Sequence, residues 1–449
     1  MVNQAARRFR AAAAALGRLP RLGLHGQVVV VGGVAFSVEG LRTWLHLGAR
    51  LEVQTPDGAA VAGEVVALRD GLATALAFGP LDGIGPGQPV ALAPPACLAV
   101  DESWLGRVLD PLGRPLDGRG PLRPGQAPRP LRATPPPAGR RARLGPRLDL
   151  GVRVLDAFAT CRRGQRLGLF AASGVGKSTL LAMLAADADC DVAVLGLVGE
   201  RGRELREFLE DDLGPEGLAR SVVVCATSDS PALLRREAAY AAMTVAEHFA
   251  AQGKQVLLLM DSVTRFAMAL REIGLAAGEP PATRGYTPGV FAELPRLLER
   301  AGPREEGNPG AVTGLFTVLV EGDDHDEPVA DAVRGILDGH VVLDRRIGEG
   351  GRYPAVDVLR SLSRTVPGCL SEAERALMLR ARRILALQAE MADLVRLGAY
   401  RAGTDPAVDE ALRLGPRIEA VLAQGKGERG TVEEAFAALA RAMEAPDGA

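Results

Sequence analysis

The residues best suited to chemistry lie in the stretch GLFAASGVGKSTLL, residues 168–181. Only three of the 53 basic residues in this chain are lysines, and one of the three, Lys177, is in this stretch. A compact ammonium group can reach between phosphate oxygens, and nearby glycines let backbone N–H groups turn toward an anion. The stretch departs from the phosphate-binding pattern G-x-x-x-x-G-K-[ST] at its first position, where Ala171 replaces glycine. Because an apolar strand pattern precedes the loop and a helical pattern follows it, we predict a nucleotide site.

Within this loop we expect different groups to bind the phosphates and a metal ion. Lys177 would contact the β- and γ-phosphates, and the hydroxyl of Ser178 would coordinate Mg²⁺. The positive end of the helix that begins at Lys177 adds to the attraction for phosphate. The residues predicted to contact the nucleotide here are Ala172, Ser173, Gly174, Val175, Gly176, Lys177, Ser178 and Thr179.

Two acidic residues follow apolar strand patterns and are candidates to act on the metal ion and on water. Asp261 ends QVLLLMD and is expected to hold the Mg²⁺ shell together with Ser178. Glu200, in LGLVGERGREL, can take a proton from a water that attacks the γ-phosphate. The alternatives are a helix cap at Asp261 and a surface ion pair between Glu200 and Arg201 or Arg203.

The segment YPAVDVLRSLSR supplies two further candidates, Tyr353 and Arg364. An arginine far along the chain from its own phosphate loop is a candidate arginine finger, which completes the site of a neighbouring subunit. A surface salt bridge is the alternative for Arg364, and a core or interface tyrosine is the alternative for Tyr353.

The pattern of elements around these residues predicts an α/β protein with a parallel sheet, a small N-terminal β-barrel and a C-terminal helical domain. Short β-branched runs with turn signals fill residues 21–95, and strands alternate with helices within residues 96–368. Strand signals stop after Cys369, and residues 369–449 begin with a capping box, Ser371 and Glu374.

Composition excludes several classes of protein. The net charge of -2 argues against a nucleic-acid binder, and the five scattered cysteines argue against a zinc site. No apolar run is long enough to span a membrane. Residues 1–20 are basic, as in a transit peptide, but the spacing of Phe9, Ala12, Ala13 and Leu16 favours a helix that binds a partner.

Several motifs together resemble the rotary ATPase α/β family. PAVDVLRSLS, residues 354–363, fits the signature P-[SAP]-[LIV]-[DNH]-x-x-x-S-x-S in full. GERGRE resembles the catalytic-glutamate segment of the F-type β subunit, and SGVGKS resembles its P-loop. Longer segments are similar to the type III protein-export ATPases, and HDEPVADAVRGILDGH and PATRGYTPGVFAELPRLLERAG resemble the flagellar branch more than the injectisome branch. The resemblance covers residues 107–403 strongly and the barrel loosely.

The resemblance implies a RecA-like core and a role for each candidate residue. It implies that Glu200 is the catalytic base and that Arg364 reaches into the adjacent subunit. It also implies that Tyr353 stacks on adenine and that Arg201 and Arg265 lie near the γ-phosphate.

An assembly is also implied by the resemblance. It comprises a homohexamer in the cytoplasm, peripheral to the inner membrane at the flagellar base. A negatively regulating stator protein would bind the N-terminal helix, a coiled-coil stalk would enter the ring, and an inner-membrane export gate would lie above it. Export substrates and their chaperones are the remaining partners that the resemblance implies, and no nucleic acid is expected among them.

The leading hypothesis is therefore a Mg²⁺-dependent ATPase that energises flagellar protein export. The alternatives are an injectisome ATPase, an F- or V-type subunit, an RNA helicase of the Rho type, and a silent scaffold subunit. The chain departs from the family at Ala172, usually glycine, and at Thr179, usually a small aliphatic residue. If residue 172 needed a positive φ, alanine would cost about 1–2 kcal/mol.

Overall fold

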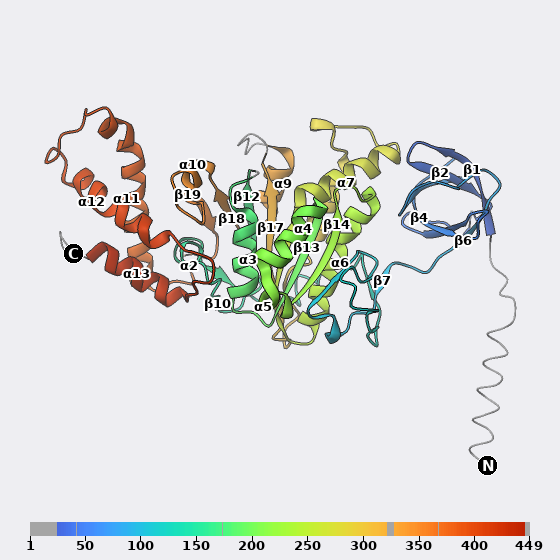
Figure 1. Ribbon diagram of the computed structural model, residues 1–449, viewed down its shortest axis with the longest axis horizontal. Helices are drawn as coiled ribbons and strands as arrows, with labels where there is room; N and C mark the ends of the chain where they lie inside the picture. The colour runs from blue at the N-terminus through green and yellow to red at the C-terminus, as the bar shows by residue number, and fades with distance from the viewer. Residues whose placement is uncertain (1–24, 42, 173, 321–326, 367, 445–449) are drawn as a thin grey trace, which may run out of the picture. The chain divides into compact units, whose positions relative to one another are not determined.

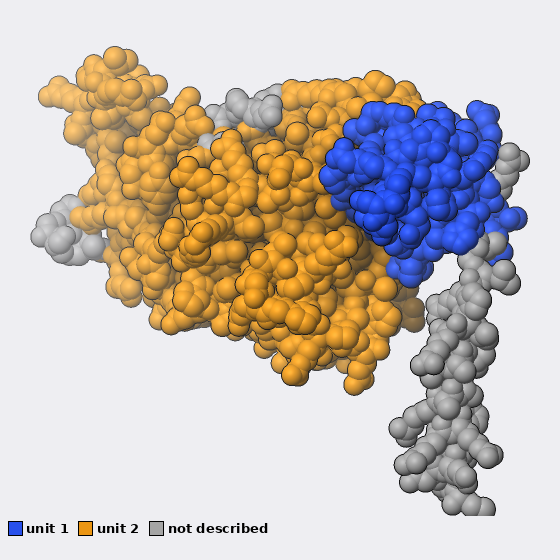
Figure 2. Space-filling view, turned by 45° about the vertical axis from the view of Figure 1, so that its right-hand side comes forward, with its two compact units in different colours: residues 1–95 blue, residues 96–449 orange. Residues whose placement is uncertain are grey.

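The computed structural model describes residues 25–41, 43–172, 174–320, 327–366 and 368–444. The chain forms two compact units, residues 1–95 and 96–449, which Figure 2 shows in different colours. The predicted N-terminal helix, with Phe9 and Leu16, lies outside the described residues, as does Ser173 in the phosphate loop. None of the described helices combines the length and the apolar character needed to cross a membrane.

The first unit contains a closed barrel of six antiparallel strands in the order β1-β2-β5-β4-β3-β6. Alternate residues of each strand point inward, so that Leu51 and Val53 of β3 are buried with Phe36 and Val38 of β2. The prediction of a small barrel is confirmed. Its strands are β1 (His25–Gly32), β2 (Ala35–Glu39), β3 (Arg50–Gln54), β4 (Ala60–Arg69), β5 (Leu72–Ala77) and β6 (Pro89–Leu92).

A nine-stranded sheet forms the centre of the second unit, with main order β19-β18-β12-β17-β15-β13-β14-β8 (Figure 1). Most neighbours are parallel, whereas β19 runs antiparallel to β18, and β16 pairs antiparallel with β17 off the main path. The strands are β8 (Arg107–Leu109), β12 (Arg166–Ala171), β13 (Val192–Glu200), β14 (Ser221–Thr227), β15 (Gln255–Asp261), β16 (Gly302–Pro303), β17 (Ala311–Leu319), β18 (Gly339–Leu343) and β19 (Val356–Ser363). Two small two-stranded sheets accompany it, made of β7 (Cys97–Leu98) with β9 (Arg129–Pro130) and β10 (Arg147–Leu148) with β11 (Cys161–Arg162).

Helices cover both faces of this sheet, as the apolar strand sequences predict. Along β13, Ala193 and Leu195 belong to a core shared with α3, and Val192 and Val194 belong to a core shared with α6. The helices are α2 (Arg153–Phe158), α3 (Lys177–Asp187), α4 (Gly202–Glu207), α5 (Gly214–Ala219), α6 (Ala232–Ala251), α7 (Val263–Ala276), α8 (Pro288–Leu298), α9 (Pro328–Ile336) and α10 (Arg345–Glu349), with a π-helical turn at Phe208–Leu213 and 3₁₀ turns at Glu102–Trp104 and Thr283–Gly285.

Three C-terminal helices, α11 (Glu372–Arg396), α12 (Pro406–Leu422) and α13 (Val432–Glu444), gather beside β19 and α2 (Figure 1). They share a buried core with α3, to which Leu414 and Phe436 contribute. The predicted capping box at the start of α11 is present, since the Ser371 and Glu374 side chains each accept from the other residue's backbone N–H. The predicted fold class is thus confirmed, whereas the predicted boundary at residues 368/369 stays a prediction.

Candidate nucleotide site

The loop between β12 and α3 is shaped by two glycines. Gly174 and Gly176 have φ of +79° and +85°, a region that other residues rarely adopt. At Gly176 a side chain would also be crowded, because an added Cβ would lie 3.2 Å from the ring of Tyr353. Both glycines are therefore required for the loop to open directly into helix α3.

The two alanines before the loop carry no such requirement. Ala171 ends β12 in ordinary extended pairing with Leu319 and Leu343. Ala172 is not among the described non-glycine residues with positive φ, which are Asp70 and Arg284. Because residue 172 does not have a positive φ, alanine is not strained at this position.

We expect Ala172→Gly to leave the fold intact and to change KM and kcat by less than about threefold, because the backbone already adopts a conformation open to alanine. Stability should fall by about 0.4–1 kcal/mol, since glycine gives the unfolded chain more freedom. Steady-state kinetics and denaturant unfolding measure the two effects. A tenfold or larger rise in kcat would show that alanine restrains the loop.

The predicted catalytic and metal-binding residues converge at the carboxyl edge of the sheet. Lys177 Nζ lies 2.6 Å from Asp261 Oδ1 and 3.7 Å from Glu200 Oε1. Asp261 Oδ1 also accepts a 2.7 Å hydrogen bond from Thr317 Oγ1. Because β12, β13 and β15 are parallel, their last residues meet at one edge, and this brings the three groups together.

A β-bulge directs Glu200 into the site. Gly199 has a φ of +72° and interrupts the pairing of β13 with β14. An added Cβ at this position would lie 3.2 Å from Arg265 Cβ. Ser262 caps α7 by accepting from the Arg265 backbone N–H, which fixes the start of the helix that carries Arg265. Glycine at 199 therefore allows Arg265 to pass beside the strand.

Two buried polar atoms in this site have no hydrogen-bond partner among the described residues, Glu200 Oε1 and Arg265 Nε. Burial raises the pKa of Glu200, the charge of Asp261 raises it further, and Lys177 opposes the change. A substrate that brings anionic oxygens and a water would satisfy both atoms. Ser178 and Asp261 offer the hard oxygen ligands that Mg²⁺ prefers, so the residues present fit a nucleoside triphosphate with Mg²⁺.

A cavity of about 640 Å³ opens in front of these groups. Its lining includes the predicted residues Ala172, Gly174, Gly176, Lys177, Ser178, Thr179, Glu200, Arg201 and Arg265. Arg201 is largely exposed and forms a 3.1 Å ion pair with Glu204, so the surface pair expected as an alternative involves Arg201 but not Glu200.

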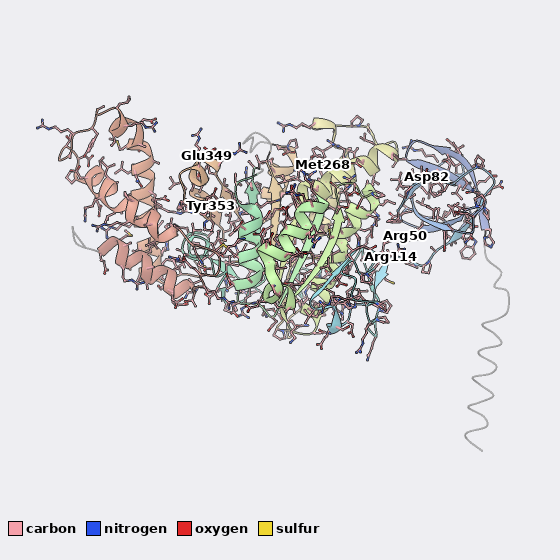
Figure 3. All side chains as sticks on the ribbon, viewed as in Figure 1. Arg50, Asp82, Arg114, Met268, Glu349 and Tyr353 are labelled. Atoms are coloured by element: carbon pink, nitrogen blue, oxygen red, sulfur yellow. The ribbon has the colours of Figure 1, made fainter. Side chains whose placement is uncertain are left out.

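A second hollow of about 330 Å³ is lined by Gly174 and Val175 of the loop and by the half-exposed Tyr353. Figure 3 labels Tyr353 and Glu349, both of which line this hollow, near the C-terminal helices. Arg345 lines both cavities and was not predicted from the sequence. The strand pattern HVVL that ends two residues before Arg345 was the available signal, since strand ends face the ligand edge.

The segment that carries Tyr353 is tied to helix α12. The backbone N–H of Gln424 donates to the Tyr353 carbonyl at 2.8 Å. Arg352 is buried, forms an ion pair with Glu419 of α12, and donates to the carbonyls of Pro354 and Val356. The C-terminal helices therefore help to set the position of Tyr353.

Of the predicted site residues that the structure describes, Arg364 alone lies away from its own phosphate loop. In the antiparallel pairing of β18 with β19, Leu343 faces Val356 and Gly339 faces Ser363. Leu343 also faces Ala171, the residue at the start of the phosphate loop. Arg364 therefore follows the end of β19 at the opposite edge of the sheet, where its side chain is exposed.

Three successive parts of the chain match known protein families. Residues 151–363 match the ATP synthase alpha/beta family, nucleotide-binding domain. Residues 25–91 match the beta-barrel domain of the same family, and residues 370–441 match the T3SS EscN ATPase C-terminal domain.

Individual relatives are similar over nearly the whole chain. The flagellum-specific ATP synthase of Caulobacter vibrioides is 53% identical over 97% of this chain and 99% of its own. The type 3 secretion system ATPase of Xanthomonas euvesicatoria is 47% identical over 88% of both chains. Among solved structures, the assembled ATPase EscN in complex with its central stalk EscO, from enteropathogenic E. coli, is 37% identical with a TM-score of 0.84, over 93% of this chain and 100% of that one.

Proposed function

The chain belongs to the ATP synthase alpha/beta family, in the branch of the flagellum-specific ATP synthases, and from this premise we propose a homohexameric ring whose ATP hydrolysis energises type III export of flagellar proteins. The protein is an ATP hydrolase with a nucleotide-binding site. The observation that carries the proposed chemistry is the buried Glu200 Oε1 at the phosphate loop, which lies 3.7 Å from Lys177 Nζ and has no hydrogen-bond partner among the described residues.

We propose that Glu200 accepts the proton of the attacking water. Its carboxylate is held at the strand end by the bulge at Gly199, and burial makes it a stronger base than an exposed glutamate. Lys177, now paired with Asp261, would contact the β- and γ-phosphates, and Arg265 would contact the γ-phosphate.

The remaining contacts would bind the nucleotide and its metal ion. Ser178 and Asp261 would hold Mg²⁺, which when bound supplies positive charge next to the phosphate oxygens. Backbone N–H groups of residues 172–179 would surround the phosphates, and Tyr353 would stack on adenine. Arg201 lies at the cavity rim, where release from Glu204 would let it approach the γ-phosphate.

A neighbouring subunit would complete each site. Arg364 lies at the sheet edge opposite its own phosphate loop, so a finger role requires a second copy of the chain. One chain carries both Glu200 and Arg364, which favours a ring of identical subunits over an F- or V-type ring of two different subunits.

The proposed partners follow the relatives. The complex of EscN with its central stalk EscO supports a coiled-coil stalk for this chain as well. We further propose a stator protein at the N-terminal helix, an inner-membrane export gate, and export substrates with their chaperones. The ring would act in the cytoplasm, peripheral to the inner membrane at the flagellar base.

An injectisome role is the second candidate, favoured by the 47% identity to the Xanthomonas euvesicatoria enzyme. Deletion of the gene separates the two candidates. Loss of flagella with secretion of other effectors intact supports flagellar export, whereas fully flagellated cells would contradict it.

We expect the ATPase rate per chain to rise steeply with protein concentration, because each site needs the finger of a second subunit. Initial rates measured across the concentration range where light scattering shows assembly test this. A rate per chain that stays constant from monomer to ring would contradict the shared site.

A further inference from the structure

We propose that Gln165 is a positioning residue that holds Arg364 in the orientation in which a neighbouring subunit uses it. The inference rests on the proposed function, because it takes Arg364 as the residue that completes a neighbour's site. Gln165 immediately precedes β12 and is fully buried, at the same edge of the sheet as Arg364.

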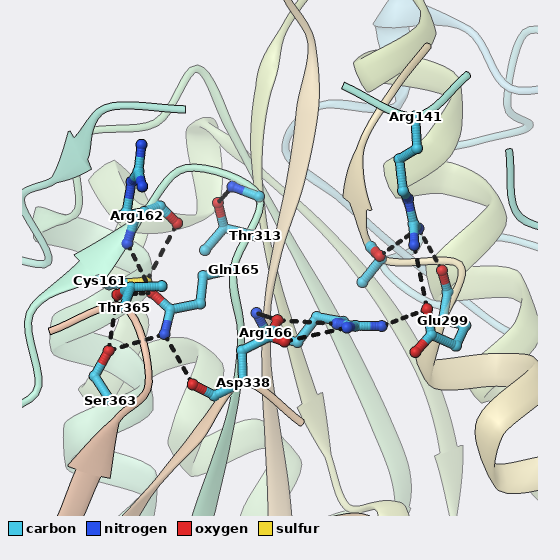
Figure 4. Close-up of polar contacts among 12 residues, drawn as sticks. Arg141, Cys161, Arg162, Gln165, Arg166, Glu299, Thr313, Asp338, Ser363 and Thr365 are labelled. Carbon is cyan, nitrogen blue, oxygen red and sulfur yellow. Dashed lines mark hydrogen bonds and ion pairs between the residues drawn. The ribbon is translucent and has the colours of Figure 1, made fainter. Parts of the chain in front are cut away.

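The side-chain amide of Gln165 contacts the residues on both sides of Arg364 (Figure 4). Its Nε2 donates to Ser363 Oγ at 2.9 Å, and its Oε1 accepts from Thr365 Oγ1 at 2.9 Å. One planar group therefore fixes the two residues that flank the finger.

Every hydrogen-bonding position of this amide is used. Nε2 also donates to the Asp338 carbonyl at 3.2 Å, and Oε1 also accepts from the Arg162 backbone N–H at 2.9 Å. The Asp338 carbonyl in turn accepts from the Arg364 backbone N–H at 2.9 Å. Such a fully satisfied buried network holds its members in one arrangement.

The backbone, rather than contacts of its own guanidinium, directs Arg364 outward. Ser361 and Ser363 are buried, so the alternation of a strand turns Leu362 and Arg364 to the exposed side. Ser363 Oγ is fixed again by donating to the Thr160 carbonyl at 2.9 Å. Among the described residues, the Arg364 side chain makes one long contact, from Nη2 to the Arg334 carbonyl at 3.5 Å.

Strand β12 links this network to the subunit's own site. Gln165 precedes its first residue, and Ala171, its last, leads into the phosphate loop. At a rise of about 3.3 Å per residue, roughly 20 Å separate the two ends. The two ends of strand β12 therefore hold different groups. One end leads into the subunit's own phosphate loop, and the other adjoins the network that positions Arg364 for the neighbouring subunit's site.

The test replaces Gln165 with methionine, which keeps the length and the unbranched shape of the side chain but removes its hydrogen bonds. We expect kcat to fall by about 10–100-fold, because small displacements of a catalytic group are costly, with the KM for ATP unchanged within about twofold. Gln255→Met is the matched control, because Gln255 begins β15 at the same sheet edge and donates to the Pro309 carbonyl. The control should keep the wild-type rate.

Mixed rings distinguish loss of finger position from general damage. Mixed before assembly with Glu200→Gln, which supplies an intact finger, Gln165→Met should regain activity. Mixed with Arg364→Ala, which lacks a finger, it should gain none.

The positioning role would be overturned by either of two results with mixed rings: an equal gain of ATPase activity with both partner variants, or no gain with either. A wild-type rate for Gln165→Met alone would also overturn it. If Arg364→Ala itself kept the wild-type rate, the finger role in the proposed function would fail instead.

Discussion

Replacing Glu200 with glutamine should lower kcat for ATP hydrolysis by about 10²–10⁴-fold, because the amide cannot accept a proton from the attacking water. The side chain keeps its shape, so the bulge at Gly199 and the packing of Arg265 beside it should be preserved. ATP should therefore still bind, with an affinity near that of the wild type. Single-turnover hydrolysis and equilibrium binding of a fluorescent ATP analogue measure the two quantities separately.

The matched control for this variant is Glu204→Gln. Glu204 lines the same cavity, but it is half-exposed and pairs with Arg201 at the rim. Its neutralisation should change kcat by less than about threefold, as expected for an exposed ion pair. Equal losses in the two variants would show that negative charge in the cavity, rather than proton transfer at Glu200, determines the rate.

The second large effect is expected for Arg364→Ala, which should lower kcat by about 10³–10⁵-fold, as loss of an arginine finger does. Arg364 is exposed and lies at the sheet edge away from its own phosphate loop, so the fold and the binding of ATP by the isolated subunit should persist. Steady-state rates, together with the mass of the assembled ring, measure the effect.

Arg360→Ala serves as the control for the finger. Arg360 is on the same strand, β19, is also exposed, and has Nη1 3.5 Å from Asp344 Oδ2. It should retain most of the wild-type rate. If Arg364→Ala lost activity only in proportion to a loss of assembled rings, Arg364 would be an interface residue and not a finger.

The placement of three predicted site residues at one edge of the sheet follows a rule of parallel sheets, so it could be predicted from the sequence. Lys177, Glu200 and Asp261 each follow an apolar strand, and the carboxyl ends of parallel strands meet at one edge. That the three side chains lie close together could therefore be predicted, but the direct contact of Lys177 Nζ with Asp261 Oδ1 at 2.6 Å could not.

Other features depended on information that a sequence pattern does not contain. Whether alanine is strained at position 172 depends on the φ angle there, which the sequence does not determine. The contacts of Gln165 with Ser363 join residues 198 positions apart and require β18 to lie between β12 and β19. Arg345 was missed for the same reason, since the place of β18 beside β12 is a matter of sheet order.

The most direct test of the shared site mixes two variants that should each be inactive, Glu200→Gln and Arg364→Ala, before assembly. In an equal random mixture, about a quarter of the sites join an intact Glu200 to an intact Arg364 from the neighbour, given one site per interface between identical subunits. We predict that ATPase activity returns on mixing, to roughly a tenth to a quarter of the wild-type rate per chain. Assembled mixed rings as inactive as either variant alone would contradict the account.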